Sequence, residues 1–198
     1  MNYITDVMFW VSNGLLIPVI VGLIILFFFS LLLLGGLWAA RSRYRAHLKQ
    51  YATLFDKLRA GDVESLKDAL SKSKGATPFE KVALELFTAQ PHERDYLIDN
   101  YELELERRLS TAKLLTKFGP ILGLMGTLIP MGPALVGLGT GDIAGMAYNM
   151  QVAFATTVLG MFSSGIGYLV LQVVRSYNQK GLIWLDLLNN TLDNGTKL

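Results

Sequence analysis

Two long apolar stretches interrupt the polar sequence of this chain. Residues 1–40 and 118–174 contain no Lys or Arg, although the chain has 18 such residues. A helix rises about 1.5 Å per residue, so roughly 20 apolar residues cross a hydrocarbon layer of about 30 Å. The pattern therefore predicts an all-α integral membrane protein with an external N-terminus at 1–13 and a first transmembrane helix at 14–40.

The second apolar stretch is long enough for two crossings. It divides at a glycine-rich segment, residues 137–145 (GLGTGDIAG), whose Asp142 is the one charge between 118 and 174. We predict transmembrane helices at 114–138 and 147–174, joined by an external loop at 139–146. The segment lacks the Gly-Lys-Ser/Thr ending of a phosphate-binding loop, so a tight hairpin turn is the favoured interpretation.

Basic residues set the orientation. Arg41, Arg43 and Arg45 follow the first apolar stretch at once, and Arg175 and Lys180 follow the second. Under the positive-inside rule these ends face the cytoplasm. The N-terminus is then outside the cytoplasmic (inner) membrane. A cytoplasmic domain occupies 41–113, and a cytoplasmic C-terminal helix or tail occupies 175–198.

The polar segment 41–113 has helical periodicity. Apolar residues recur every three or four positions, which predicts that the first transmembrane helix continues into the cytoplasm as far as Gly61-Asp62. Two short helices are expected at about 63–71 and 79–87, separated by a loop, and another helix is expected to begin at Pro91. These helices form a small cytoplasmic bundle, which is either a stalk or a docking surface. The face of the first helix consists of Leu48, Tyr51, Phe55 and Leu58.

Composition argues against several classes of function. The chain has no Cys, and its two His residues, His47 and His92, lie in polar sequence without partners at metal-binding spacing. We therefore expect no metal, no cofactor and no nucleophile–base pair, and an enzyme is not expected. Acidic residues accompany the basic ones, so the positive charges indicate membrane topology rather than nucleic-acid binding.

The second and third predicted transmembrane helices carry unusual stripes of small and hydroxylated residues at three- and four-residue spacing. Such stripes allow close helix packing, with hydroxyls bonding a neighbour's backbone. Alternatively, they line a pore or a smooth wall past which another helix moves. Proton transport normally requires an ionisable group in the membrane. Apart from Lys117 near the start of the first of them, neither predicted helix has one, and neither has an acid, so the chain is a passive scaffold or a partner supplies the acid. The stripes are Thr116, Pro120, Gly123, Thr127, Pro130 and Ala134 in one helix, and Ala153, Thr157, Gly160, Ser164 and Gly167 in the other.

Several of these segments resemble the MotA/TolQ/ExbB proton channel family. Residues 118–127 (FGPILGLMGT) are similar to the family's second-span pattern, a Gly-Pro step followed by Gly-Leu-x-Gly-Thr. Residues 155–160 (ATTVLG) are similar to its third-span Thr-x-x-Gly pattern, and residues 105–109 (LERRL) resemble the segment before the second span. With the three-span topology, the resemblance covers about residues 102–180.

The resemblance implies a homopentamer whose second and third spans enclose the transmembrane helices of a single-span partner of the ExbD/TolR/MotB type. By the same resemblance, the partner's intramembrane Asp is expected to take up and release protons, and the chain is expected to be the stator-like subunit of a motor driven by the proton-motive force. By motif position, the ion-path residues are Thr127 and Thr157, with Thr156 beside them. The small residues of the pore wall are Gly123, Pro130, Ala153, Gly160 and Ser164.

The chain also departs from the family pattern. Relatives of the ExbB and TolQ type often carry an acid one turn before the third-span Thr, where this chain has Gln151 and Val152. Pro130 and Pro133 follow Thr127 and predict a locally altered helix. The large torque domain and fourth span of flagellar MotA are missing, which places the chain nearer ExbB and TolQ on a divergent branch.

Three alternatives stay open. A sodium-driven version of the motor would use the adjacent hydroxyls of Thr156 and Thr157. A non-conducting oligomeric scaffold would use the stripes only for helix packing. A stand-alone channel lacks an ionisable pore residue to give it selectivity.

Overall fold

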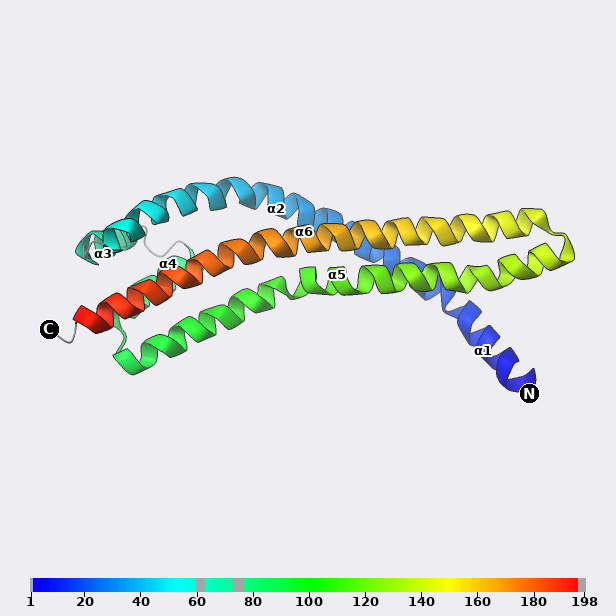
Figure 1. Ribbon diagram of the computed structural model, residues 1–198, viewed down its shortest axis with the longest axis horizontal. Helices are drawn as coiled ribbons and strands as arrows, with labels where there is room; N and C mark the ends of the chain where they lie inside the picture. The colour runs from blue at the N-terminus through cyan, green and yellow to red at the C-terminus, as the bar shows by residue number, and fades with distance from the viewer. Residues whose placement is uncertain (1, 60–62, 73–76, 196–198) are drawn as a thin grey trace. The chain divides into compact units, whose positions relative to one another are not determined.

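The computed structural model describes residues 2–59, 63–72 and 77–195. Side chains are described within these ranges except at positions 2, 5, 39–50, 53, 54, 57–59, 194 and 195. Every element in the described residues is an α-helix, as the sequence predicts (Figure 1). The helices are α1 (Asn2–Gly14), α2 (Leu16–Arg59), α3 (Val63–Lys72), α4 (Pro78–Thr88), α5 (Pro91–Thr140) and α6 (Ile143–Gly195).

Three of the helical segments are long and apolar enough to cross a membrane, which confirms the number predicted. They lie within Asp6–Trp38, Pro91–Thr140 and Ile143–Asp193. The chain divides into two compact units. We call residues 1–37 and 111–171 the apolar unit, and residues 38–110 and 172–198 the charged unit.

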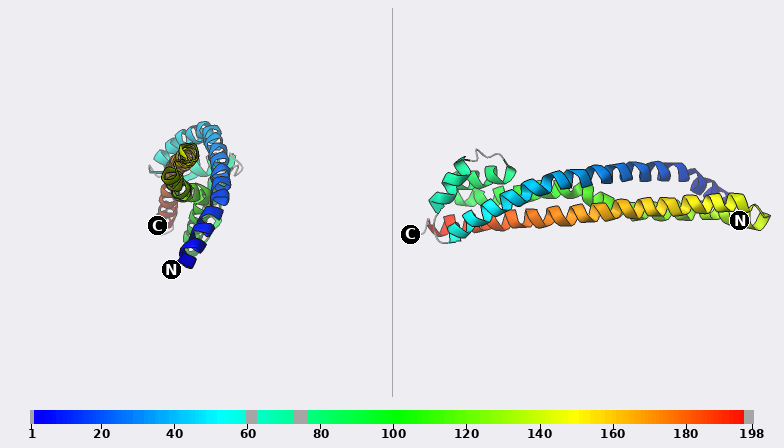
Figure 2. Two further views of the ribbon diagram at one scale, coloured as in Figure 1. Left: turned by 90° about the vertical axis from the view of Figure 1, so that its right-hand side faces the viewer. Right: turned by 90° about the horizontal axis from the view of Figure 1, so that it is seen from above.

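In the apolar unit, α5 and α6 lie side by side and run in opposite directions (Figures 1 and 2). The turn between them is shorter than the loop expected at 139–146, because α5 continues to Thr140 and α6 begins at Ile143. Gly141 has a positive φ of 77°, which glycine adopts without strain. Asp142 caps α6, since its Oδ1 accepts the Gly145 N–H at 2.9 Å.

The first two helices meet at a break in the chain. α1 ends at Gly14 and α2 begins at Leu16. In α2, Val19 and Leu23 form a small core with Ile129 of α5. The partly buried residues packed against this core are Leu16, Leu122 and Met125. Leu122, Met125 and Ile129 therefore identify the side of α5 that faces α2.

The charged unit has a core of large apolar side chains. The predicted short helices correspond to α3 and α4, and α5 begins at Pro91 as expected. The predicted break at Gly61-Asp62 and the side chains of His47, Leu48 and Leu58 lie outside the described residues. The buried core consists of Tyr51, Phe55, Leu66, Leu70, Ala83, Leu86, Ile98, Tyr101, Leu105, Leu185 and Leu188.

A buried carboxylate fixes the start of α4. Glu80 is 2% exposed, and its Oε2 accepts the backbone N–H of Thr77 at 3.1 Å while the Thr77 hydroxyl accepts the Glu80 N–H. This reciprocal pair is a capping box, which satisfies two N–H groups that the helix itself leaves unpaired. Glu80 Oε1 also accepts the hydroxyl of Tyr51 from α2. Burial and the neighbouring Glu80 raise the pKa of Tyr51, so its hydroxyl keeps its proton as the donor.

Candidate functional site

The two predicted stripes face each other within one chain. A Cβ placed on Gly160 would lie 2.5 Å from the carbonyl oxygen of Gly119 and 2.8 Å from the Cα of Gly123. A Cβ on Gly126 would lie 2.5 Å from the Cβ of Thr156. Only glycine permits the two backbones to approach this closely. The glycines therefore set the spacing of α5 and α6, as small residues commonly do between membrane helices.

Most of the residues predicted to form a pore wall lie in this packing interface. Gly123 and Gly160 contact each other across it, and Ala153 is 3% exposed. Pro130 is fully buried. Close packing within the chain accounts for the small side chains at these positions, and their role as a pore wall stays a prediction.

Ser164 makes a hydrogen bond across the interface. Its hydroxyl donates to the carbonyl oxygen of Thr116 in α5 at 3.1 Å. Thr116 lies four residues before Pro120, which has no N–H to donate to that carbonyl. α5 continues as one helix through Pro120, Pro130 and Pro133, and the local change of that helix at the last two stays a prediction.

The three predicted ion-path threonines occupy different surroundings. Thr156 is 4% exposed, and its hydroxyl lies within hydrogen-bond distance of the carbonyl oxygens of Val152 and Ala153. Thr157 and Thr127 are only partly buried. The structure therefore places Thr156 in the packing interface, and leaves Thr127 and Thr157 accessible.

Thr127 and Thr157 lie on the same side of the helix pair. Successive helical residues are about 100° apart, so Thr127 lies roughly 200° from Met125, which faces α2. In α6, Phe162 contacts Phe27 of α2 with ring centroids 5.7 Å apart, and Thr157 lies about 140° from Phe162 around the helix. Both threonines therefore flank the α5–α6 interface on the side away from α2.

We call this surface the hydroxyl face, defined as Thr127 and Thr157 with the exposed apolar side chains of Leu124, Met131 and Met161 beside them. The hydroxyl of Thr127 donates to the carbonyl of Leu124 at 2.7 Å, and that of Thr157 donates to the carbonyl of Ala153 at 3.0 Å. A hydroxyl that donates in this way keeps its lone pairs as acceptors. The hydroxyl face can therefore accept a hydrogen bond or contact a cation.

The hydroxyl face has no acid or base of its own. Residues 118–140 and 143–174 contain no Asp, Glu, Lys, Arg or His. Among the described residues, no group of three or more His, Cys, Asp or Glu side chains could hold a metal ion. The parts of α5 and α6 that carry the hydroxyl face therefore offer no acidic or basic side chain.

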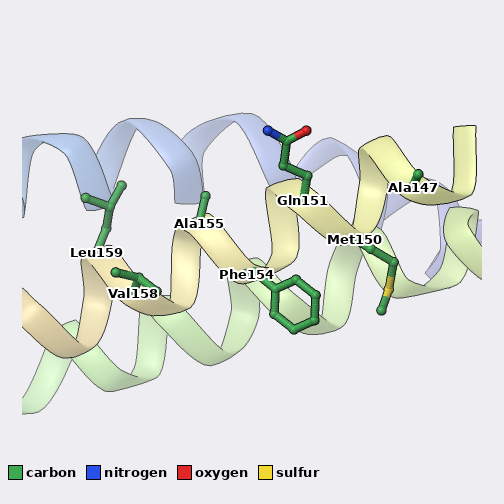
Figure 3. A pocket seen from close by; sticks show the side chains of 7 residues that line it. All are labelled: Ala147, Met150, Gln151, Phe154, Ala155, Val158 and Leu159. Atoms are coloured by element: carbon green, nitrogen blue, oxygen red, sulfur yellow. The ribbon is translucent and has the colours of Figure 1, made fainter. Parts of the chain in front are cut away.

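A shallow groove lies along the outer face of α6, in the part that belongs to the apolar unit. Figure 3 shows Gln151 pointing away from Met150 and Phe154, which lie on the other side of the helix ribbon. The sequence marked Gln151 only as a replacement for an acid, and no local pattern predicted a groove. The lining residues are Ala147, Met150, Gln151, Phe154, Ala155, Val158 and Leu159.

In the charged unit, buried polar residues were also missed by sequence reasoning. Arg94 is 7% exposed and donates to Asp193 Oδ1 at 2.8 Å. Asp186 is exposed, but partial burial of its carboxyl raises its pKa, and the negative charges of Asp95 and Asp99 raise it further. Glu80 could have been found from its sequence signal, since Thr77-x-x-Glu80 before an apolar run is typical of a capping box. For Arg94 the sequence holds no comparable signal.

Comparison with known proteins identifies a family for nearly half of the chain. Residues 92–182 match the MotA/TolQ/ExbB proton channel family. This region includes the α5–α6 interface and the hydroxyl face, and the match confirms the predicted resemblance. No curated protein and no solved structure matched the chain. Residues 92–182 are therefore similar to a proton channel family, and three helices of the described residues are long and apolar enough to cross a membrane.

Proposed function

We propose, because residues 92–182 match the MotA/TolQ/ExbB proton channel family, that the chain is a pentameric, stator-like subunit of a membrane motor driven by the proton-motive force. Five copies enclose the transmembrane helices of a single-span partner of the ExbD/TolR/MotB type. The partner's intramembrane Asp carries the proton, and Thr127 and Thr157 are the groups of this chain that it contacts.

The observation that carries the proposal is the hydroxyl face. It presents two accessible hydroxyls that already donate to their own helices, and the sequence around it has no acid. A surface that served only for packing would gain nothing from accessible hydroxyls. A surface that meets a protonatable group of a partner needs them.

The chemistry of contact follows from the hydrogen bonds. A protonated carboxyl can donate its O–H to the free lone pairs of Thr127 or Thr157. An ionised carboxylate can only accept, so the threonine hydroxyl must rotate away from its own carbonyl to donate. The protonated and the ionised carboxyl of the partner are thus held by different hydrogen bonds. The apolar residues Leu124, Met131 and Met161 favour the protonated, neutral carboxyl while it moves from one subunit to the next.

Charge supports the orientation in this proposal. The charged unit contains Arg41, Arg43 and Arg45 after the first apolar helix, and Arg175 and Lys180 after the third. With this unit in the cytoplasm, the N-terminus and the turn at Gly141 lie outside the inner membrane.

The test compares three valine variants of matched shape. The tagged chain is purified with its native partner from its own membranes and placed in liposomes containing a pH-sensitive dye, and a potassium diffusion potential drives proton entry. Thr157→Val is expected to lower proton flux at least about tenfold, and Thr127→Val to lower it less, since a lost hydrogen bond to a charged group is worth about 1.5–3 kcal/mol. Thr156→Val is the control, because the Thr156 side chain is buried against Gly126. Equal flux from native protein and Thr157→Val would refute the assigned role.

A sodium-driven motor is the nearest variant. In the same liposomes, a sodium gradient at equal pH on both sides drives flux only if sodium is the coupling ion. A proton gradient without sodium drives flux if the proposal holds.

A non-conducting scaffold is favoured by one observation, the close contact of Gly119 and Gly160. It predicts no flux in either gradient and an oligomer whose centre is filled by its own side chains. An electron-microscopy map of the purified complex with two extra helices at the centre would contradict the scaffold.

A further inference from the structure

Pro120 leaves a gap in the hydrogen bonds of α5. A proline has no N–H, so the carbonyl of Thr116, four residues earlier, receives no hydrogen bond from position 120. A backbone carbonyl that is shielded from water and receives no hydrogen bond is unfavourable. The helix tolerates this proline if another group donates to the carbonyl.

Ser164 of α6 is that group. Its hydroxyl donates to the Thr116 carbonyl at 3.1 Å. The neighbouring Ser163 donates instead to Leu159 of its own helix at 2.8 Å. Ser164 reaches across because Gly119 has no side chain: a Cβ on Gly119 would lie 3.0 Å from the Ser164 Cβ and 2.7 Å from the Gly160 carbonyl oxygen.

The position of this bond links it to the hydroxyl face. Pro120 lies about two turns before Thr127 in α5, and Ser164 lies about two turns after Thr157 in α6. Because the helices are antiparallel, one cross-helix bond fixes both their separation and their register. A slip of one residue would turn Thr157 away from Thr127 by about 100°.

We propose that Ser164 is a positioning residue: it replaces the backbone hydrogen bond that Pro120 removes and thereby holds α5 and α6 in the register that puts Thr127 and Thr157 on one face. The cross-helix bond does not depend on the proposed function. Its effect on ion flow does rest on that function.

The test is a double-mutant cycle between positions 120 and 164. In the native background, Ser164→Ala is expected to raise the unfolding equilibrium constant, measured by titration with SDS in mixed micelles, roughly three- to tenfold. In the Pro120→Ala background, the N–H of the new alanine donates to the Thr116 carbonyl. There, Ser164→Ala should change the constant less than about twofold.

Two further variants serve as controls. Ser163→Ala removes a buried hydroxyl from the same turn of α6, and it should have the same effect in both backgrounds because Ser163 bonds its own helix. Ser164→Cys keeps the shape with a weak S–H donor and should give an intermediate effect in the native background. The proposal is overturned if Ser164→Ala has equal effects in both backgrounds, or no effect in the native one.

Proton flux in liposomes tests the positioning role separately. Ser164→Ala should lower the flux of the native complex about fivefold or more, yet leave the flux of Pro120→Ala unchanged. A loss of flux that is the same in both backgrounds would overturn the positioning role. If Thr157→Val leaves flux unchanged while the stability cycle still shows coupling, the proposed function fails and the cross-helix bond stands.

Discussion

The apolar unit and the charged unit are built in opposite ways. In the apolar unit, glycines and small residues lie at the contact between α5 and α6, and large side chains such as Leu124 and Phe154 are 60% and 65% exposed. In the charged unit, large side chains such as Leu66, Leu86 and Leu185 are fully buried, and most of the charged side chains that the structure describes are exposed.

The difference follows from the surroundings that each unit is made for. Water drives large apolar side chains inward, because their removal from water is favourable. Lipid offers no such gain, so helices associate through close backbone contact and polar bonds instead. The hydrogen bonds of the two units differ in the same way. In the apolar unit, Ser164 donates to a backbone carbonyl. In the charged unit, Arg94 donates to the carboxylate of Asp193.

The largest expected effect comes from the core of the charged unit. Leu185→Ala should lower the free energy of unfolding by about 2–5 kcal/mol, because it removes buried methyl groups and leaves a cavity. Denaturant titration followed by far-ultraviolet circular dichroism measures this change. The matched variant Leu124→Ala, at an exposed site in the apolar unit, should stay within about 0.5 kcal/mol of the native protein. Comparable losses would break the contrast between the units.

In the apolar unit, adding a side chain at a helix contact, rather than removing one from a core, is expected to destabilise the protein. Gly160→Ala adds one methyl group, which would lie 2.5 Å from the backbone oxygen of Gly119 and should cost about 1–3 kcal/mol. Gly165 lies in the same helix, and a methyl group added there would have no neighbour within 4 Å, so Gly165→Ala should be neutral or stabilising by up to about 1 kcal/mol. SDS titration in mixed micelles compares them. Equal destabilisation by both variants would show that close approach is not what holds α5 to α6.

The buried carboxylate of the charged unit gives the third prediction. Tyr51→Phe removes a donor to Glu80 and should cost about 1–3 kcal/mol, since Glu80 remains buried. Tyr96→Phe is the control because Tyr96 is 70% exposed, and it should cost less than about 0.5 kcal/mol. Thermal unfolding at pH 7 measures both. A Tyr51→Phe protein as stable as the native one would show that the hydrogen bond from Tyr51 to Glu80 does not stabilise the start of α4.

The smallest effect concerns acidic side chains of the charged unit. The folded protein raises the pKa of Asp186 above its ordinary 3.8, so the ionised form is less favourable in the folded state. This penalty is absent below the ordinary pKa, grows as the pH rises through the folded pKa, and is fully present at pH 7. Because the Asp186 side chain is exposed and solvent screens the repulsion, Asp186→Asn should stabilise the protein by only a few tenths of a kcal/mol at pH 7, and by nothing near pH 3.

Asp193→Asn provides the matched comparison. It weakens the bond from the buried Arg94 and should destabilise the protein at pH 7 by about 1 kcal/mol. Unfolding midpoints between pH 3 and 8 test both signs. Destabilisation by Asp186→Asn at pH 7 would contradict the repulsion from Asp95 and Asp99.

The sequence predicted the helices well because their determinants are local. The absence of charge marks the membrane helices, the apolar periodicity marks α4, and Pro91 marks the start of α5. The loop at 139–146 was predicted too long, because the sequence does not show that Asp142 caps α6 through Gly145. Spacing alone identified the stripes, but a stripe does not show which of its members meet inside the chain.

The candidate site was predicted in part for the same reason. Thr127, Thr156 and Thr157 are equivalent by composition, and only the pairing of α5 with α6 distinguishes the buried Thr156 from its accessible neighbours. Likewise, Ser164 was expected among small wall residues. Its bond to Thr116 depends on the antiparallel register, which no local pattern encodes.

The two-residue turn at Gly141 and Asp142 has a consequence for how this gene can change. Surface loops usually accept inserted residues, since length there costs little. Here the length of the turn determines which residues of α6 lie opposite the glycines of α5. One inserted residue would shift α6 by about 1.5 Å and rotate it by about 100°, which would carry Gly160 away from Gly119. An exposed turn, ordinarily the most permissive part of a protein, is in this chain among the positions where insertions and deletions are least tolerated.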